Sequence, residues 1–138
     1  MSVRKGDRSE GKLQVLNVAR ILKKHSLNKV SSKRFPKSTR WVYAIPIVNE
    51  VRDLCLCIKK ANSVYATSPA EWSYRRSEQV KAHAHLESLY ELVEDAYDAG
   101  YIDGQQTDYW TGLVKNTDDL LKAWIKSDKE RAKSQFNL

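Results

Sequence analysis

The chain has 138 residues, of which 41% are hydrophobic and 30% charged, and its formal net charge is +7. This length and composition predict one domain with its own hydrophobic core and exclude a disordered chain. No segment approaches the roughly 18 apolar residues of a membrane span, and the polar start has no signal-like apolar core, so we expect no membrane contact. Five glycines and three prolines are few, which favours long helices over many short strands.

The first two predicted helices lie in the N-terminal half. The first runs from about Gly11 to His25, with apolar residues three or four positions apart. The second opens at residues 35–38, and its apolar stripe runs from Trp41 to Tyr65. Pro46 interrupts this stripe. Because proline lacks an N–H and its ring crowds the preceding turn, we expect a kink at Pro46 or a helix that effectively starts later.

The last two predicted helices carry clear start and stop signals. Residues 68–71 form a capping box, with Ser at the N-cap, Pro at N1 and Glu at N3. Gly100 is placed to end this third helix as a C′ glycine. Residues 103–106 form a second capping box, with Asp at the N-cap and Gln at N3, and open the fourth helix.

Four amphipathic helices with short connections predict an all-α fold, an antiparallel, up-down-up-down four-helix bundle. We expect the bundle over residues 11–127, after a flexible N-terminus of residues 1–10 and before a polar C-terminal tail of residues 128–138. Cys55 and Cys57 are two positions apart on one helix and point to different faces. They are therefore expected to be free thiols of a cytoplasmic protein.

The distribution of charge is the strongest functional signal. Residues 11–49 contain nine Lys or Arg and no Asp or Glu, whereas residues 50–138 contain twelve basic and fifteen acidic side chains. A one-sided block of cations is typical of proteins that bind a polyanion, most often nucleic acid. We expect eight of these cations to contact RNA or DNA: Arg20, Lys23, Lys24, Lys29, Lys33, Arg34, Lys37 and Arg40.

Three aromatic residues, Phe35, Trp41 and Tyr43, accompany these cations and have the side-chain type that stacks on bases. We expect Phe35 and Trp41 to be core or cap residues rather than stacking platforms. An acidic face on the third helix is expected to be solvated or to meet the basic face of the first helix, within the monomer or between subunits. That face comprises Glu87, Glu91, Glu94, Asp95 and Asp98.

No pattern of catalytic residues is present, so we expect no enzyme, no cofactor and no metal. His83 and His85 are two positions apart and do not share a helical face. His83 and Glu87 have the i,i+4 spacing of metal ligands, but no second pair on another helix matches them. We therefore interpret His83 as a residue of the bundle seam. A metal-dependent enzyme that uses His83, His85 and Glu87 is the rival hypothesis.

Residues 34–41, Arg-Phe-Pro-Lys-Ser-Thr-Arg-Trp, resemble the start of the second helix in the Avd family. These are the accessory variability proteins of diversity-generating retroelements. The segments 61–62, 99–103 and 120–126 agree with the family, so the resemblance covers about residues 13–127. The family's motif corresponds here to Phe35, Pro36, Lys37, Ser38, Arg40 and Trp124.

The resemblance implies a homopentamer of non-enzymatic bundles with a positive surface. Its partners would be nucleic acid and the reverse transcriptase of the element, and its role would be to support mutagenic cDNA synthesis. The chain departs from the family at residues 44–47, where Ala-Ile-Pro-Ile replaces a common Gly-x-Arg-Ile and a basic position becomes Pro46. The alternative is a ribosome- or RNA-associated four-helix bundle without a reverse transcriptase partner.

Overall fold

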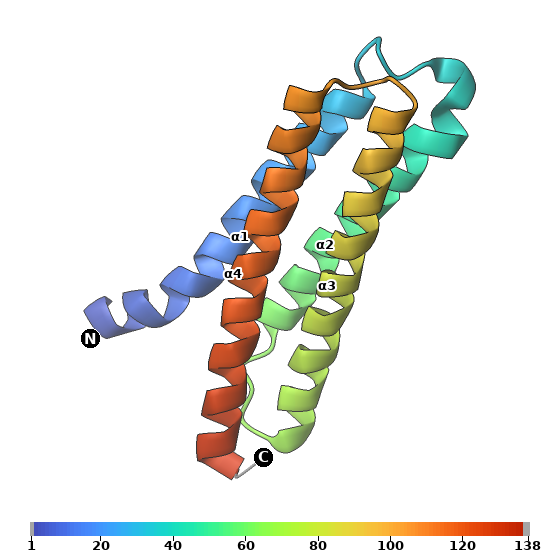
Figure 1. Ribbon diagram of the computed structural model, residues 1–138. Coiled ribbons are helices and arrows are strands. Elements are labelled where there is room, and N and C mark those ends of the chain that lie inside the picture. The colour runs from blue at the N-terminus through green and yellow to red at the C-terminus, as the bar shows by residue number, and fades with distance from the viewer. Residues whose placement is uncertain (1, 137–138) are drawn as a thin grey trace.

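The computed structural model describes residues 2–136, with side chains from Gln14 onward. These residues form four long helices and no strand, which confirms the predicted all-α fold. The helices run alternately up and down the long axis of the bundle (Figure 1). They are α1 (Ser2–Val30), α2 (Ile45–Ser63), α3 (Pro69–Asp98) and α4 (Gly104–Phe136). The segment 1–10, expected as a flexible N-terminus, is helical from Ser2 onward and forms the first part of α1. The side chain of Lys12 lies outside the side chains that the structure describes.

Each helix packs against two neighbours around one core. α1 and α3 each contact α2 and α4, so α1 and α3 lie diagonally across the bundle. Burying a Leu, Ile or Val side chain contributes about 1.5–3 kcal/mol relative to leaving it exposed. Among the described residues the largest fully buried apolar side chains are Leu22, Ile47, Leu54, Ile58, Leu86, Leu89, Trp110 and Leu121.

Helix α1 continues to Val30 rather than ending near His25. The reason lies in the contact between Ser26 and α4. Ser26 is fully buried, its hydroxyl donates to the carbonyl of Leu22 at 2.8 Å, and it accepts the indole N–H of Trp110 at 2.9 Å. This packing carries the helix past His25 and places Lys29 on α1 rather than in the connection.

The structure at the start of α2 shows how Pro46 is accommodated. A short 3₁₀ turn, η1 (Lys37–Thr39), is followed by a π turn, η2 (Arg40–Ala44), in which the N–H of Ile45 donates to the carbonyl of Arg40. α2 then begins at Ile45, so Pro46 lies in its first turn. A proline is tolerated there because its missing N–H would have no partner within the helix. The prediction of a later effective start is confirmed.

The predicted caps are present. Ser68 accepts the N–H of Glu71 at 3.3 Å, and the Glu71 carboxylate accepts the N–H of Thr67 at 2.9 Å. Asp103 and Gln106 each accept the other's N–H, at 2.8 and 2.9 Å. These bonds satisfy donors that a helix N-terminus leaves free.

Gly100 ends α3 with a φ of 83°, in the left-handed region that glycine adopts without strain. The N–H of Gly100 donates to Tyr97 and that of Tyr101 to Ala96, at 2.9 and 3.0 Å. This pair of bonds is a Schellman motif, as the C′ position of Gly100 predicts.

Helix α4 runs to Phe136, beyond the expected end of the bundle at residue 127, so the prediction of a separate polar tail is corrected. Asp128 is only 4% exposed, and it accepts hydrogen bonds from Arg75 of α3. Ala132 is buried against Trp72 in a second small core. A mostly polar segment can therefore remain helical because one of its faces is covered by α3.

The start of α3 buries polar residues in place of an apolar one. The apolar Val80 is 51% exposed, although Trp72 on the same helix is buried. Three polar residues, Arg75, Glu78 and Gln79, are buried instead. Arg75 and Gln79 bond to Asp128 of α4, whereas Glu78 pairs with Lys81 of α3 itself. The apolar pattern of α3 alone does not reveal a polar partner on another helix.

Candidate nucleic-acid interface

The connection between α1 and α2 forms a basic groove at one end of the bundle, which we call the cap groove. It has a volume of about 570 Å³. Lys33, Lys37 and Arg40 line it and are exposed, while Phe35 is 6% exposed, as expected of a cap residue. The remaining lining residues are Val30, Ser31, Ser32, Pro36, Ala44, Ile45 and Val48. The groove therefore combines an apolar floor with three cations.

Trp41 lies next to Arg40 and is 78% exposed, so the expectation that it belongs to the core or cap was wrong. In the π turn only Ala44 is buried, and both Trp41 and Val42 face solvent. Tyr43 is half-buried and packs edge-on against Tyr101, with the ring centroids 5.0 Å apart. Trp41 is therefore the aromatic residue of this segment whose ring is open to a base.

A second group of predicted cations lies on α1. Arg20, Lys23 and Lys24 line a shallow hollow of about 480 Å³ with Asn17 and Ile21. Burial raises the pKa of the Cys55 thiol, and the charges of Lys23 and Arg20 oppose that rise. Cys55 belongs to α2. These cations therefore lie on the side of the bundle where α1 meets α2.

The same side carries two exposed cations of α2, Arg52 and Lys59. Arg52 lies four residues after Val48 of the cap groove, and Lys59 lies four residues after Cys55, so all four share a flank of the helix. Neither was among the predicted binding residues, because the acid-free block ends at Asn49. Helical spacing from Val48 was the signal that could have identified them. We call this surface the basic side. It comprises three cations of the cap groove and three of α1, together with Arg52 and Lys59 of α2: Lys33, Lys37, Arg40, Arg20, Lys23, Lys24, Arg52 and Lys59.

The eight predicted cations have no acidic partner among the described residues. Arg34 donates a weak hydrogen bond to the side chain of Gln106 at 3.4 Å. Lys29 and Lys23 are half-buried, and the other six are exposed. Such cations are available to neutralise phosphates.

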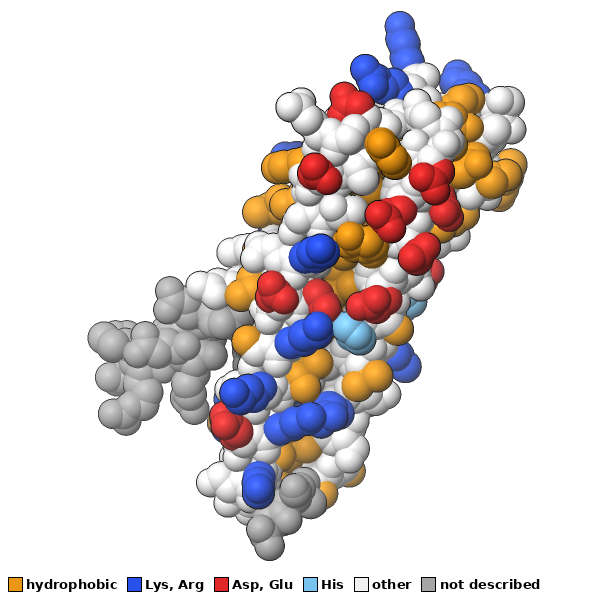
Figure 2. All heavy atoms as spheres, in the orientation of Figure 1, with side chains coloured by type: hydrophobic (Ala, Val, Ile, Leu, Met, Phe, Trp, Pro, Cys, Tyr) orange, Lys and Arg blue, Asp and Glu red, His pale blue; other side chains and the backbone are white. Residues whose placement is uncertain are grey.

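The acidic face of α3 is exposed and does not meet α1 within the monomer, because these two helices are diagonal neighbours. Figure 2 shows the α3–α4 side, where acidic side chains gather on the upper half and cations on the lower half. The upper half is the end that carries the cap groove. Near this end, the α1–α2 side of the bundle is therefore basic and the α3–α4 side is acidic.

The two histidines of α3 face different helices. His83 Nδ1 lies 2.7 Å from the carboxylate of Asp118 on α4, and His85 Nδ1 lies 2.9 Å from that of Glu50 on α2. They cannot share a metal ion. His83, Glu87 and Asp118 have candidate ligand atoms within 4.8 Å of one another. Lys122 already lies 3.2 Å from Asp118 and forms an ion pair with it, so we assign no metal to these residues.

No protein-family model, curated protein or solved structure matches this chain. The resemblance to the Avd family therefore stays a prediction. Within the described residues, no helix combines the length and the apolar character that crossing a bilayer requires.

Proposed function

We propose that this protein is a non-enzymatic nucleic-acid-binding bundle that holds single-stranded or looped RNA or DNA against its basic side. The observation that carries the proposal is the cap groove, whose three cations have no ion-pair partner among the described residues, together with the exposed Trp41 that follows Arg40 in the chain. Cations bind the phosphate backbone without regard to sequence, and an aromatic ring stacks on any base. Both features favour single strands, whose bases are accessible.

The basic side is long enough to track a strand. It begins at the cap groove and continues past Lys23 and Lys24 to Arg20 on α1, with Arg52 and Lys59 on α2. The strand would avoid the α3–α4 side, where acidic side chains gather on the half nearest the groove. Electrostatic repulsion from that side would thus set the path of the nucleic acid.

In its more specific form, we propose that the protein is an accessory factor of a diversity-generating retroelement. It would bind the reverse transcriptase and support mutagenic cDNA synthesis in the cytoplasm. Support comes from the family motif, since Phe35, Pro36, Lys37 and Arg40 all line the cap groove. A homopentamer would repeat this groove around a ring and enlarge the cationic surface. The alternative is a ribosome- or RNA-associated bundle without a reverse transcriptase.

The binding proposal is tested by reversing charges in the cap groove. The triple variant Lys33→Glu, Lys37→Glu, Arg40→Glu should bind single-stranded RNA and DNA more weakly in fluorescence anisotropy. Each lost phosphate contact should flatten the salt dependence of the binding constant by about 0.7 in the log–log slope. The matched control reverses Arg76, Lys129 and Lys133, which lie on α3 and α4 and change the net charge equally. Equal weakening by both triples would contradict the proposed interface.

The retroelement proposal is tested separately by assembly and partner. The native mass in solution should be five times that of the chain, and the co-expressed reverse transcriptase should co-purify with it. A monomer would contradict the pentamer while leaving nucleic-acid binding intact. Retention of structured ribosomal RNA, with no reverse transcriptase bound, would favour the alternative.

A further inference from the structure

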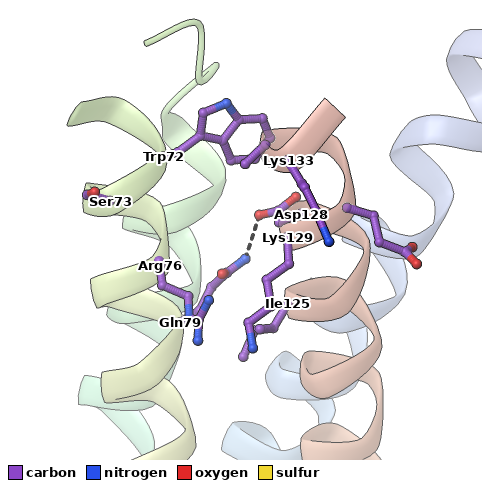
Figure 3. Close-up of a pocket in the computed structure, with 10 residues that line it drawn as sticks. Trp72, Ser73, Arg76, Gln79, Ile125, Asp128, Lys129 and Lys133 are labelled. Atoms are coloured by element: carbon purple, nitrogen blue, oxygen red, sulfur yellow. Dashed lines mark hydrogen bonds between the residues drawn. The ribbon is translucent and has the colours of Figure 1, made fainter. Parts of the chain in front are cut away.

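A second concave site lies at the end of the bundle opposite the cap groove, between the start of α3 and the end of α4. We call it the α3–α4 pocket (Figure 3). Its volume is about 490 Å³. Trp72, Ile125 and Ala132 give it an apolar wall. The pocket uses none of the residues assigned to nucleic-acid binding above.

The rim of the pocket is cationic. Arg76, Lys129 and Lys133 line it and are exposed, and Glu130 is the only acidic residue on the rim. None of the three cations forms an ion pair within the described part of the chain. An anionic group that enters the pocket would therefore meet free positive charges.

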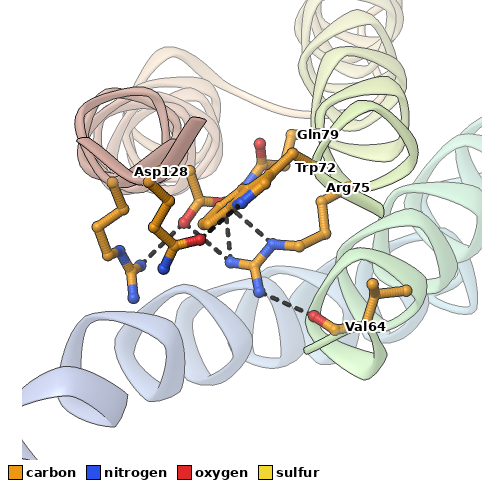
Figure 4. Close-up of polar contacts among 7 residues, drawn as sticks. Val64, Trp72, Arg75, Gln79 and Asp128 are labelled. Atoms are coloured by element: carbon orange, nitrogen blue, oxygen red, sulfur yellow. Dashed lines mark hydrogen bonds and ion pairs between the residues drawn. The ribbon is translucent and has the colours of Figure 1, made fainter. Parts of the chain in front are cut away.

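The floor of the α3–α4 pocket is a buried polar network (Figure 4). Its one carboxylate, that of Asp128, is compensated by cations, so the network does not repel an anion. The carboxylate of Asp128 accepts hydrogen bonds from Arg75 at 2.8, 2.9 and 3.1 Å, from Gln79 at 2.8 Å and from Arg131 at 2.9 Å. Its negative charge is thus compensated by two guanidinium groups. Arg75 also donates to the carbonyl of Val64 at 2.9 Å, which holds the network in place.

Two atoms of this network, Gln79 Oε1 and Arg131 Nε, have no partner among the described residues, and of these two residues Gln79 lines the pocket. Gln79 is fully buried and lines the pocket, and its Nε2 donates to Asp128. That bond defines the orientation of the amide, because a carboxylate can only accept. The Oε1 atom is left without a hydrogen-bond donor among the described residues. Buried acceptors normally have partners, so this atom is open to a donor from a bound molecule.

We propose that the α3–α4 pocket binds a planar organic anion, in which a ring with an N–H or O–H donor is joined to a phosphate or carboxylate. The ring would pack on Trp72, Ile125 and Ala132, and its donor would bind Gln79 Oε1. The anionic group would lie among Arg76, Lys129 and Lys133. A long nucleic-acid strand does not fit this position, because acidic side chains gather on the adjoining half of the same side.

Two probes test the class of ligand by calorimetry and by NMR of the Trp72 indole N–H. AMP carries a phosphate, and indole-3-acetate carries a carboxylate. At least one should bind with a stoichiometry of one per chain. Adenosine and indole-3-ethanol lack the charge, whereas inorganic phosphate and acetate lack the ring. All four should bind at least about tenfold more weakly than the matching probe.

The role of Gln79 is tested on the ligand, because substituting Gln79 would also remove its bond to Asp128. Purine riboside 5′-monophosphate and 1-methylindole-3-acetate lack the ring donor of the matching probe. Each should bind several-fold more weakly than its parent. Equal binding of parent and donor-free analogue would overturn the assignment of Oε1.

The rim is tested with the variant Arg76→Glu, Lys129→Glu, Lys133→Glu. These side chains are exposed, so the variant should melt as a folded bundle, and it should lose probe binding. The cap-groove triple described above is the charge-matched control and should bind the probe normally. The proposal is overturned if neither probe binds, if neutral or ringless analogues bind equally well, or if binding survives the rim reversal. These results are independent of nucleic-acid binding, which the cap-groove triple measures.

Discussion

Arg75 of α3 and Asp128 of α4 form a buried bidentate ion pair, with the Arg75 Nη2 and Nε atoms 2.8 and 3.1 Å from Asp128 Oδ2. The guanidinium of Arg75 also lies over the rings of Trp72 and Trp124, at 5.3 and 5.4 Å from their centroids. The pair joins two helices whose apolar contact is sparse at this end. It connects the end of α4 to the bundle.

Asp128→Ala should lower the free energy of unfolding by about 3–5 kcal/mol, because it leaves the charge of Arg75 buried without a partner. Urea denaturation measures this loss. The double variant Arg75→Met, Asp128→Leu removes both charges and should recover most of the stability. A loss below about 1 kcal/mol for Asp128→Ala would show that the pair does not hold the two helices together.

Trp41→Ala should weaken single-strand binding by about 1–3 kcal/mol, because it removes the exposed aromatic ring that follows Arg40 in the chain. The ring makes little contact with the core, so the free energy of unfolding should change by less than about 0.5 kcal/mol. Anisotropy titration and urea denaturation provide the two measurements. Tyr65→Ala, at a residue 76% exposed and outside the basic side, is the matched control and should leave binding unchanged.

His25 should make stability depend on pH. Its ring packs edge-on against Tyr109 and Trp110, at 5.0 and 5.6 Å between centroids. Burial lowers the pKa of His25, and the charge of Lys29 adds to this effect. The unfolded chain therefore binds a proton more readily than the folded chain. The contribution of His25 to stability is fully present above the ordinary value of 6.5 and is lost as the pH falls through its lower folded pKa.

His25→Gln tests this prediction, because glutamine does not titrate. The stability of the variant, measured by thermal melting between neutral and mildly acidic pH, should fall less than that of the parent chain. Parallel curves for the two proteins would exclude His25 as the titrating group.

Ser68→Ala should cost about 0.5–2 kcal/mol of stability, because it removes the side chain that accepts the N–H of Glu71 at the start of α3. Urea denaturation is again the measurement. Ser77→Ala, on the exposed surface of the same helix, is the control and should be neutral or slightly stabilising. Equal effects of the two substitutions would argue against a capping role for Ser68.

The ends of α3 and the start of α4 were predictable because their signals are local. A capping box or a C′ glycine acts on backbone groups within a few residues of itself, so Ser68, Gly100 and Asp103 carry the information in their own neighbourhood. The apolar periodicity likewise predicted the four helices and their antiparallel order. The acid-free block identified most of the cations of the basic side.

Tertiary packing decided what those local signals could not. Trp41 faces solvent because a π turn precedes Pro46, and Gln79 and Asp128 are buried because each finds a polar partner on another helix. Their partners are about fifty positions away in the chain, so no short-range pattern reveals them. The sequence by itself determined that the chain forms four helices and which segments carry an excess of positive or negative charge. Only the packed bundle placed the cations of α1 and α2 on one side and formed the α3–α4 pocket, because both depend on distances between helices.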